Sequence, residues 1–202
     1  MDFARRFVQS DQLQMTRPSL QNAVIRGPKT YLRFPDGGDL EEFIALNRAS
    51  KRLHRGLASP PTEPEQFDAL LEKCQRDNYV GFMICRVVDG AIVGAINISE
   101  IVRGSFQSAY LGYYVGARYA RQGYMTEAIR LALTYAFENL RLHRLEANIQ
   151  PGNRASLALA KHAGFVREGF SKRYLKIGGR WRDHERWAIL AEDWRARVRK
   201  DG

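Results

Sequence analysis

The stretch GARYARQGYMT, residues 116–126, places two arginines and two glycines between a β-prone aromatic run and a segment with helical periodicity. A glycine-bearing turn that opens a helix presents free backbone N–H groups, and the helix dipole adds positive potential there. Arg121 and Gln122 can add side-chain donors, and Gly123 allows a ligand to approach the backbone closely. The stretch therefore predicts a phosphate-binding turn, with an ordinary strand–helix connection as the alternative. It has neither the Lys-Ser/Thr pair of a Walker A loop nor a GxGxxG pattern, so the nucleotide class stays open.

Two carboxylates stand where a general base could work. Glu146 lies in the middle of a strand-like segment that directly follows the predicted helix, and Glu100 ends an earlier strand-like segment. Each could relay a proton through a water molecule. The alternative for both is a structural salt bridge on a strand face or at a strand end.

The elements that must position these residues are read from periodicity and from turn residues. Strands are predicted over 23–35, with a break at Gly27-Pro28, and over 79–87, 91–100, 109–115, 143–149, 165–175 and 180–190. Helices are predicted after Asp39 as the cap, from Pro64 to about residue 76, over 125–140 and over 154–162. The third helix places Met125, Ile129, Ala132 and Ala136 on one face. The result is one α/β domain around a mixed sheet, residues 21–195, with a loose arm over 1–20 and a basic tail over 196–202.

Composition narrows the class of protein. The 202 residues are 45% hydrophobic and 27% charged, as in a globular domain. No apolar run spans a bilayer and the start has no signal-peptide core, so a cytoplasmic protein is expected. Cys74 and Cys85 lack metal-ligand spacing and are expected to be reduced and structural. The net charge of +10 favours anionic partners such as a phosphorylated cofactor or nucleic acid.

The order of these elements resembles that of the GNAT N-acetyltransferases. Their pyrophosphate loop follows the pattern Gln/Arg-x-x-Gly-x-Gly/Ala, and the matching window here is AlaArgGlnGlyTyrMet, residues 120–125. Gly123 fits the pattern, whereas Ala120 and Met125 depart from it, which puts side-chain contacts at those two positions in doubt. The resemblance implies an α/β (α+β) fold with a mixed, mostly antiparallel sheet, flanked by helices and splayed at the acetyl-CoA-binding strand.

Later motifs narrow the resemblance. PGNRAS (151–156), HAGF (162–165), VRGSF (102–106) and the segment 168–184 are similar to those of the RimJ-type ribosomal-protein-alanine N-acetyltransferases. The resemblance covers roughly residues 20–195. It implies transfer of an acetyl group from acetyl-CoA, without a metal, to the N-terminal alanine of a ribosomal protein.

The resemblance also implies a set of cofactor-binding residues. The strand before the loop would pair with the pantetheine arm and polarise the thioester, the loop would hold the pyrophosphate, and the start of the short helix would lie near the pantetheine. These residues are Tyr113, Tyr114, Val115, Arg121, Gln122, Gly123, Tyr124, Met125, Thr126, Asn153 and Ser156.

A general acid is harder to assign. Many members of the family have a tyrosine shortly before the Gly-Phe pair, and that position is Ala160 here. Ser156 and Tyr174 are the substitutes, although Ser156 could equally serve the first turn of its helix and Tyr174 the core. His162 and His184 could shuttle protons, with a structural hydrogen bond as the alternative for each.

The absence of an obvious strong base favours an α-amine acceptor. An α-amine titrates near 7.8 and a lysine near 10.4, a difference of about 3.5 kcal/mol in the cost of deprotonation. Because ribosomal-protein tails are basic, acidic side chains are expected beside the peptide. The candidates are Asp36, Asp39, Glu63 and Glu65.

Two other functions remain open. One keeps the chemistry and changes the acceptor to an antibiotic, a polyamine or another small amine. The other is a non-catalytic protein that binds the ribosome or RNA through its basic surface. With any of these functions, the protein is expected to be a monomer or a dimer. Binding to RNA with a steep salt dependence and no acetyl transfer would favour the second.

Overall fold

The computed structural model describes residues 22–201, so the expected N-terminal arm lies outside it. The strands are β1 (Ile25–Arg26), β2 (Thr30–Arg33), β3 (Tyr79–Arg86), β4 (Ile92–Val102), β5 (Ser108–Val115), β6 (Arg144–Ile149), β7 (Val166–Ile177) and β8 (Arg180–Leu190). The α-helices are α1 (Leu40–Ala49), α2 (Lys51–His54), α3 (Pro64–Lys73), α4 (Tyr124–Thr134), α5 (Arg154–Ala163) and α6 (Ala191–Asp201). Short turns of 3-10 helix, η2 (Gly37–Asp39) and η3 (Ala117–Tyr119), and a π-helical turn, η4 (Tyr135–Asn139), complete the described chain.

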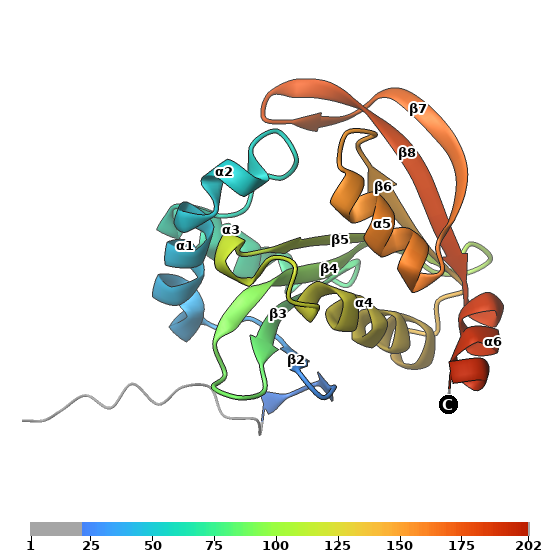
Figure 1. Cartoon of the computed structure of the whole chain (residues 1–202), viewed down its shortest axis with the longest axis horizontal. Coiled ribbons are helices and arrows are strands. Elements are labelled where there is room, and N and C mark those ends of the chain that lie inside the picture. Colours follow the sequence, from blue (N-terminus) through green and yellow to red (C-terminus); the bar gives the residue numbers. More distant parts are fainter. Residues whose placement is uncertain (1–21, 202) are drawn as a thin grey trace, which may run out of the picture.

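The described strands form one eight-stranded sheet in the order β1-β2-β3-β4-β5-β6-β8-β7. Each neighbouring pair is antiparallel apart from β5 and β6, which run parallel. These two strands pair only from Ser108↔Arg144 to Tyr110↔Glu146, and beyond that point they diverge (Figure 1). The prediction of a mixed, mostly antiparallel sheet with a splay at the strand before the loop is confirmed.

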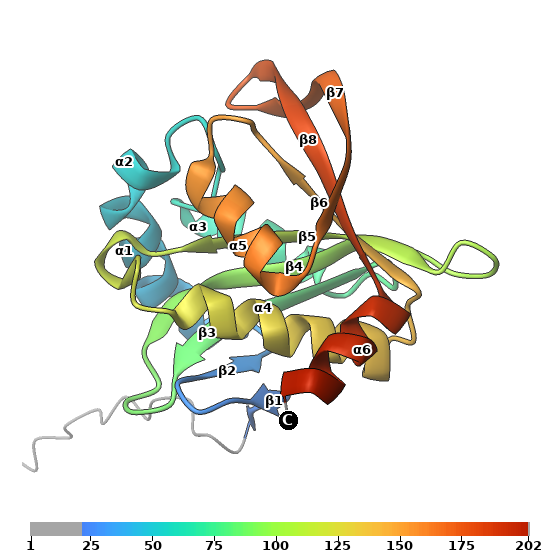
Figure 2. The same ribbon diagram turned by 45° about the vertical axis from the view of Figure 1, so that its right-hand side comes forward.

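Helices cover both faces of the sheet (Figures 1 and 2). On the α1 face, which α1 and α3 cover, Phe43 lies 6.3 Å from the ring of Tyr114. On the α4 face, which α4 and α5 cover, Tyr135 meets Phe82 edge-on at 4.9 Å. The apolar face predicted for the third helix is confirmed, because its four members, Met125, Ile129, Ala132 and Ala136, are all buried.

Two local expectations differ from the structure. Asp39 is buried and forms an ion pair with the buried Arg33, and in the described chain its side chain makes no capping bond to α1. A buried guanidinium needs a paired carboxylate, and this requirement outweighs the helix cap. Residues 196–201, expected as a separate basic tail, continue α6, which packs Trp194 against Phe137 at 5.5 Å.

Within residues 22–201 no helix is long and apolar enough to cross a membrane. Cys74 and Cys85 are free thiols, and burial raises the pKa of both, that of Cys85 to about 11. Thiols that stay protonated are poor nucleophiles and poor metal ligands, which agrees with the structural role expected for them.

Candidate active site

The backbone N–H and C=O groups of β5 point alternately toward β4 and toward the gap that opens beside β6. The N–H of Gly116 is donated to the carbonyl of Val93 in β4, at 2.8 Å. The carbonyl of Gln107, at the other end of the strand, accepts from the N–H of His143 on the β6 side, also at 2.8 Å. Because successive residues of a strand point their backbone groups in opposite directions, even-numbered residues face β4 and odd-numbered residues face the gap.

The open edge of β5 therefore consists of Leu111, Tyr113 and Val115. In the described chain β6 pairs with β5 only as far as Tyr110, a pairing that engages the N–H of Leu111, so no strand covers the carbonyl of Leu111 or the two residues after it on this edge. Tyr114 belongs to the even-numbered set and pairs with Ala95 of β4. Of the predicted TyrTyrVal segment, Tyr113 can offer both backbone groups to an extended ligand and Val115 its N–H, since the carbonyl of Val115 lies 2.9 Å from His54 Nε2, and Tyr114 can offer neither group.

The two glycines of the loop after β5 serve different purposes. Gly116 allows α1 to approach, since a Cβ at this position would lie 2.3 Å from Leu46 Cδ1. Ser50, at the end of α1, then accepts the N–H of Ala117 at 2.8 Å and fixes the start of the loop. Gly123 has φ of 84°, in the left-handed region where a side chain is disfavoured.

The N-terminus of α4 is left open to an anion. No side chain of residues 22–201 caps it at Gly123, and its first internal bond runs from the N–H of Glu127 to the carbonyl of Gly123. The N–H groups of Tyr124, Met125 and Thr126 therefore lack helical partners and point outward, with the positive end of the helix dipole behind them. This is the geometry predicted for a phosphate-binding turn.

The side chains of the loop contribute unequally. Arg121, with φ of 61°, is exposed and has no ion-pair partner among the described residues. Gln122 turns its amide inward and donates to the carbonyl of Arg118 at 2.7 Å. Met125 is buried in the core. Arg121 is thus the predicted side chain that is free to meet a ligand here.

The start of α5 lies across the gap from β5. Asn153 caps α5 by accepting the N–H of Ser156 at 3.2 Å, and Tyr113 donates its hydroxyl to the carbonyl of Ser156 at 3.4 Å. Burial raises the pKa of Tyr113 to about 12, so this phenol stays a donor. The structure thus brings Asn153 and Ser156 to the open edge, and the first-turn role weighed for Ser156 is present.

A cluster of phenols and a carboxylate stands where β5 and β6 separate. Tyr110 pairs with Glu146 in register, and its hydroxyl lies 3.5 Å from that of Tyr174 on β7. A bulge in β7, in which Arg173 has φ of 50°, turns Tyr174 toward β5. The contact with Tyr174, together with partial burial, raises the pKa of Tyr110 to about 12. Sequence reasoning missed Tyr110, whose role depends on this pairing across strands.

Arg144 holds the carboxylate of Glu146. It donates to Glu146 at 2.8 Å and also to Glu168 at 2.6 Å, and the ion pair lowers the pKa of Glu168. The side chain of Glu146 is 12% exposed, so it is fixed but still reachable from the gap. The salt bridge weighed for Glu146 is therefore present, at a position that also suits a base.

The remaining predicted residues, Glu100, His162 and His184, differ in burial and in their contacts. Glu100 is exposed in a bulge of β4, with φ of 51°, directly after Ser99, the residue that pairs with Tyr110. His162 is exposed near the end of α5. His184 is buried, its Nδ1 lies 3.0 Å from the carbonyl of Arg182, and its ring packs against Tyr174. His184 thus makes the structural hydrogen bond considered as its alternative, and its ring also packs against Tyr174.

His54 is a second residue that the sequence did not single out. Its Nε2 lies 2.9 Å from the carbonyl of Val115 on the open edge, and its ring meets Tyr114 at 5.4 Å. The imidazole is buried, which lowers its pKa, and its Nδ1 has no partner among the described residues. His54 therefore links α2 to the last residue of β5.

A cavity of about 430 Å³ opens on the α1 face. Its polar lining includes Tyr79, Asn97 and Tyr114 on the sheet, Gln66, Glu72 and Lys73 of α3, and Ser59 and Arg76 from the segments on either side of that helix. Because Tyr110 lies on the same face of the sheet as Asn97 and Tyr114, the cavity and the phenol cluster are accessible from one side.

Comparison with known proteins agrees with this geometry. Residues 29–166 match the family model described as an acetyltransferase (GNAT) domain. The chain is 38% identical over 178 residues to the probable N-acetyltransferase YjcK of Bacillus subtilis, covering 84% of this chain and 98% of that protein. It is 43% identical over 103 residues to the ribosomal protein uS5-alanine N-acetyltransferase of Escherichia coli, a match that covers about half of each (51% and 53%). Mycobacterium smegmatis RimJ, solved in complex with CoA-disulfide, superposes with a TM-score of 0.74 at 26% identity, covering 84% of this chain and 90% of that one.

Proposed function

Because this chain belongs to the GNAT family of acetyltransferases, we propose that it transfers the acetyl group of acetyl-CoA to a protein N-terminal α-amine, most specifically the alanine of a ribosomal protein. One observation carries the proposal. The open edge of β5 runs from the uncapped start of α4 to the cluster of Tyr110, Glu146 and Tyr174. A ligand with an anionic end and an amide-bearing arm fits this track.

The chain's own backbone would bind the cofactor. The N–H groups at the start of α4 would hold the pyrophosphate, with Arg121 as an added cation. Tyr113 and Leu111 would pair with the amides of the pantetheine arm, and Asn153 and Ser156 would line the other side of the gap. This fit needs no side chain at Ala120 or Met125, so the departures from the family pattern leave the cradle intact.

Acetyl-CoA supplies an acetyl thioester, which an amine can attack only when the amine is neutral. Glu146 would accept the proton of the acceptor ammonium, directly or through one water molecule. The raised pKa of Tyr110, about 12, keeps its phenol protonated at pH 7, and Tyr110 or Tyr174, whose hydroxyls lie 3.5 Å apart, would donate a proton to the departing sulfur. The proton taken at the amine and the proton given to the sulfur balance.

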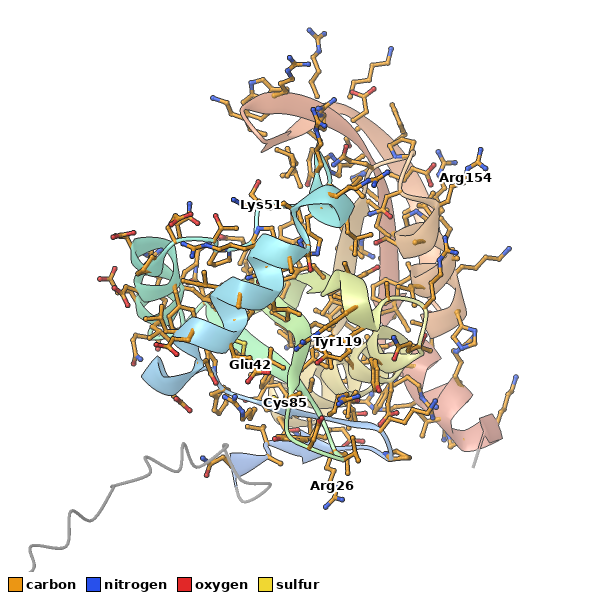
Figure 3. The ribbon with its side chains drawn as sticks, turned by 60° about the vertical axis from the view of Figure 1, so that its left-hand side comes forward. Arg26, Glu42, Lys51, Cys85, Tyr119 and Arg154 are labelled. Atoms are coloured by element: carbon orange, nitrogen blue, oxygen red, sulfur yellow. The ribbon has the colours of Figure 1, made fainter. Side chains whose placement is uncertain are left out.

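The charges around the gap bear on the acceptor. The exposed cations Lys51, Arg52 and Arg55 belong to α2 and the residue after it, and four more belong to the tip of the β7–β8 hairpin: Lys172, Arg173, Lys176 and Arg180. The two segments lie close together, since a Cβ on Gly56 would be 4.0 Å from Arg182 Nη2 (Figure 1; Lys51 is labelled in Figure 3). Such a rim repels a polyamine, which is a polycation, more strongly than a peptide terminus that carries a single positive charge.

The carboxylates expected beside a basic peptide are mostly engaged elsewhere. Asp39 pairs with Arg33, Asp36 accepts the N–H of Gly38 at 2.8 Å, and Glu63 pairs with Arg48 at 2.6 Å. These contacts stabilise helix starts and the loop before α3. The acceptor is therefore proposed to have few cations next to its terminal amine.

The cavity on the α1 face supports a second candidate. Its volume of about 430 Å³ is within the range of small-molecule sites. A small amine with a hydrogen-bonding group could reach the phenol cluster from there. This acceptor would need no peptide groove.

Release of free CoA from acetyl-CoA distinguishes these functions. One peptide carries a free N-terminal alanine, a second is blocked at the N-terminus but carries a lysine, and spermidine is the third acceptor. Release with the first peptide alone is expected. Release of CoA with spermidine would favour the small-amine function. Binding of acetyl-CoA with no release of CoA in the presence of any of the three acceptors would favour a non-catalytic protein.

A further inference from the structure

Lys29 reaches the loop after β5 from the other end of the chain. A Cβ built on Gly123 would lie 3.7 Å from Lys29 Nζ, so the ammonium stands over the residue that precedes α4. Lys29 is exposed, and within residues 22–201 its ammonium has no ion-pair partner. A free cation is therefore held next to the uncapped N–H groups of the helix.

Glu127, in the first turn of α4, fixes the backbone that carries Lys29. Its Oε1 accepts the N–H of Lys29 at 2.9 Å and that of Thr30 at 3.1 Å, and its Oε2 lies 3.3 Å from the N–H of Lys29. Gly27 makes room for this carboxylate, since a Cβ there would lie 2.1 Å from Glu127 Oε1. The turn between β1 and β2 is thus tied to the start of α4.

This arrangement also keeps the carboxylate of Glu127 from occupying the N-terminus of α4. A carboxylate in the first turn of a helix would normally compete with an anionic ligand for the helix N-terminus. Here the carboxylate of Glu127 is directed at the N–H groups of the β1–β2 turn, and no side chain caps α4 in the described chain. The ammonium of Lys29 stands beside Gly123, at the open helix end.

The surrounding cleft is large, and four Lys and Arg side chains outnumber the two carboxylates in its lining, Glu127 and Glu138. It has a volume of about 980 Å³ and lies between the β1–β2 turn, α4, α5 and α6. Its basic lining comes from Arg26, Lys29, Arg130 and Arg197, and Gly123 and Thr126 stand at its loop end. Arg26 is labelled at the lower edge of the molecule in Figure 3. An anion that binds at the loop would extend into this cleft.

We propose that Lys29 is a ligand of the cofactor pyrophosphate and that Glu127 is the positioning residue that holds it over Gly123. The inference rests on the proposed acetyl-CoA site and deepens it. The loop has Ala120 where the resemblance calls for glutamine or arginine, so it lacks one side-chain donor. Lys29, brought in by the hairpin, supplies the missing positive group.

The test is equilibrium binding of CoA and of dephospho-CoA, which lacks the 3′-phosphate, to the full chain. Lys29→Ala should weaken both ligands by about tenfold, the equivalent of one charge-assisted hydrogen bond. Lys29→Arg should bind within about threefold of wild type, and added salt should shrink the difference between wild type and Lys29→Ala. Lys161→Ala, an exposed lysine on α5 outside the cleft lining, removes the same charge and should change neither affinity.

Each of the other outcomes would overturn one part of the proposal. Equal affinities of wild type and Lys29→Ala would remove Lys29 from the site while leaving the cofactor site intact. A loss seen with CoA but not with dephospho-CoA would contradict the assignment to the pyrophosphate and point to the 3′-phosphate. Failure of wild type to bind either ligand would refute the cofactor site and the inference with it.

Glu127 is tested through its coupling to Lys29. Glu127→Ala should weaken CoA about as much as Lys29→Ala, and the double variant should be no weaker than either, because the two act through one contact. Glu127→Gln keeps an oxygen that can accept both N–H groups and should restore binding. Additive losses in the double variant, or no rescue by glutamine, would reduce Glu127 to a general structural role.

Discussion

The two sides of the gap between β5 and β6 are built differently. On the cofactor side, the ligand-facing groups are backbone N–H and C=O of β5 and of the start of α4, held in place by Gly116, Gly123 and Ser50. On the acceptor side, the candidate groups are side chains from three strands that are far apart in the sequence, Tyr110, Glu146 and Tyr174. The first side depends on local geometry, and the second depends on the register of the sheet.

Because of this difference, the two sides should tolerate different substitutions. A backbone cradle survives changes of side chain and fails when the chain cannot adopt the required conformation. When one functional group of a side-chain cluster is removed, the protein still folds but its catalytic rate falls. Variants on the two sides should therefore separate cofactor affinity from turnover.

The largest expected effect is on the acceptor side. Glu146→Gln should lower kcat by at least about 100-fold, the lower range for loss of a general base, because the amide cannot accept the proton. The affinity for CoA should stay unchanged, and steady-state kinetics with a direct binding measurement checks both. Glu100→Gln is the matched comparison. A fall of similar size there, with little effect at Glu146, would transfer the role to Glu100.

The two phenols should share one function. Tyr174→Phe alone should lower kcat by less than about 100-fold, because Tyr110 remains as a donor, whereas Tyr110→Phe with Tyr174→Phe should reach at least that factor. Single and double variants in a mutant cycle measure this coupling. Strictly additive effects would show that the hydroxyls act independently.

A smaller effect is expected from Gly123 on the cofactor side. Gly123→Val places a β-branched residue at φ of 84° and should lower the free energy of unfolding by about 1–2 kcal/mol. It should weaken CoA binding by about tenfold by displacing the N–H groups at the start of α4. Gly123→Asn, which tolerates this conformation, should bind CoA nearly as well as wild type. Equal CoA binding by the valine variant would contradict the backbone cradle.

The smallest effect concerns His54, which links α2 to the last residue of β5. Burial lowers its pKa in the folded state, so near and below pH 6.5 the unfolded chain takes up the proton more readily. Stability should fall as pH drops from 7 to 5, and His54→Gln should reduce that fall. The pKa of His184 is also lowered by burial, so part of the fall should remain. Thermal unfolding of wild type and His54→Gln between pH 5 and 7 tests this prediction. An equal dependence of stability on pH in the two proteins would contradict it.

The sequence predicts the cofactor side better than the acceptor side. The strand, the loop and the helix face of Met125 and Ile129 follow from local periodicity, and all are present. Tyr110 and His54 could not be predicted, because their partners are brought together by sheet register and helix packing across 64 and 61 residues of sequence.

Competition for polar partners explains the remaining differences. Asp39 has the sequence context of a helix cap, and only the burial of Arg33 shows why its carboxylate turns inward. The contact of Glu127 with the β1–β2 turn spans 98 residues and has no local signature.

The measurement that tests the central claim most directly uses one peptide with a free N-terminal alanine and an internal lysine. After incubation with the enzyme and acetyl-CoA, tandem mass spectrometry locates the acetyl group. The account predicts acetylation at the alanine α-amine with the lysine unmodified, and loss of that product in Glu146→Gln. Acetylation of the lysine, or an α-amine product undiminished in Glu146→Gln, would contradict it.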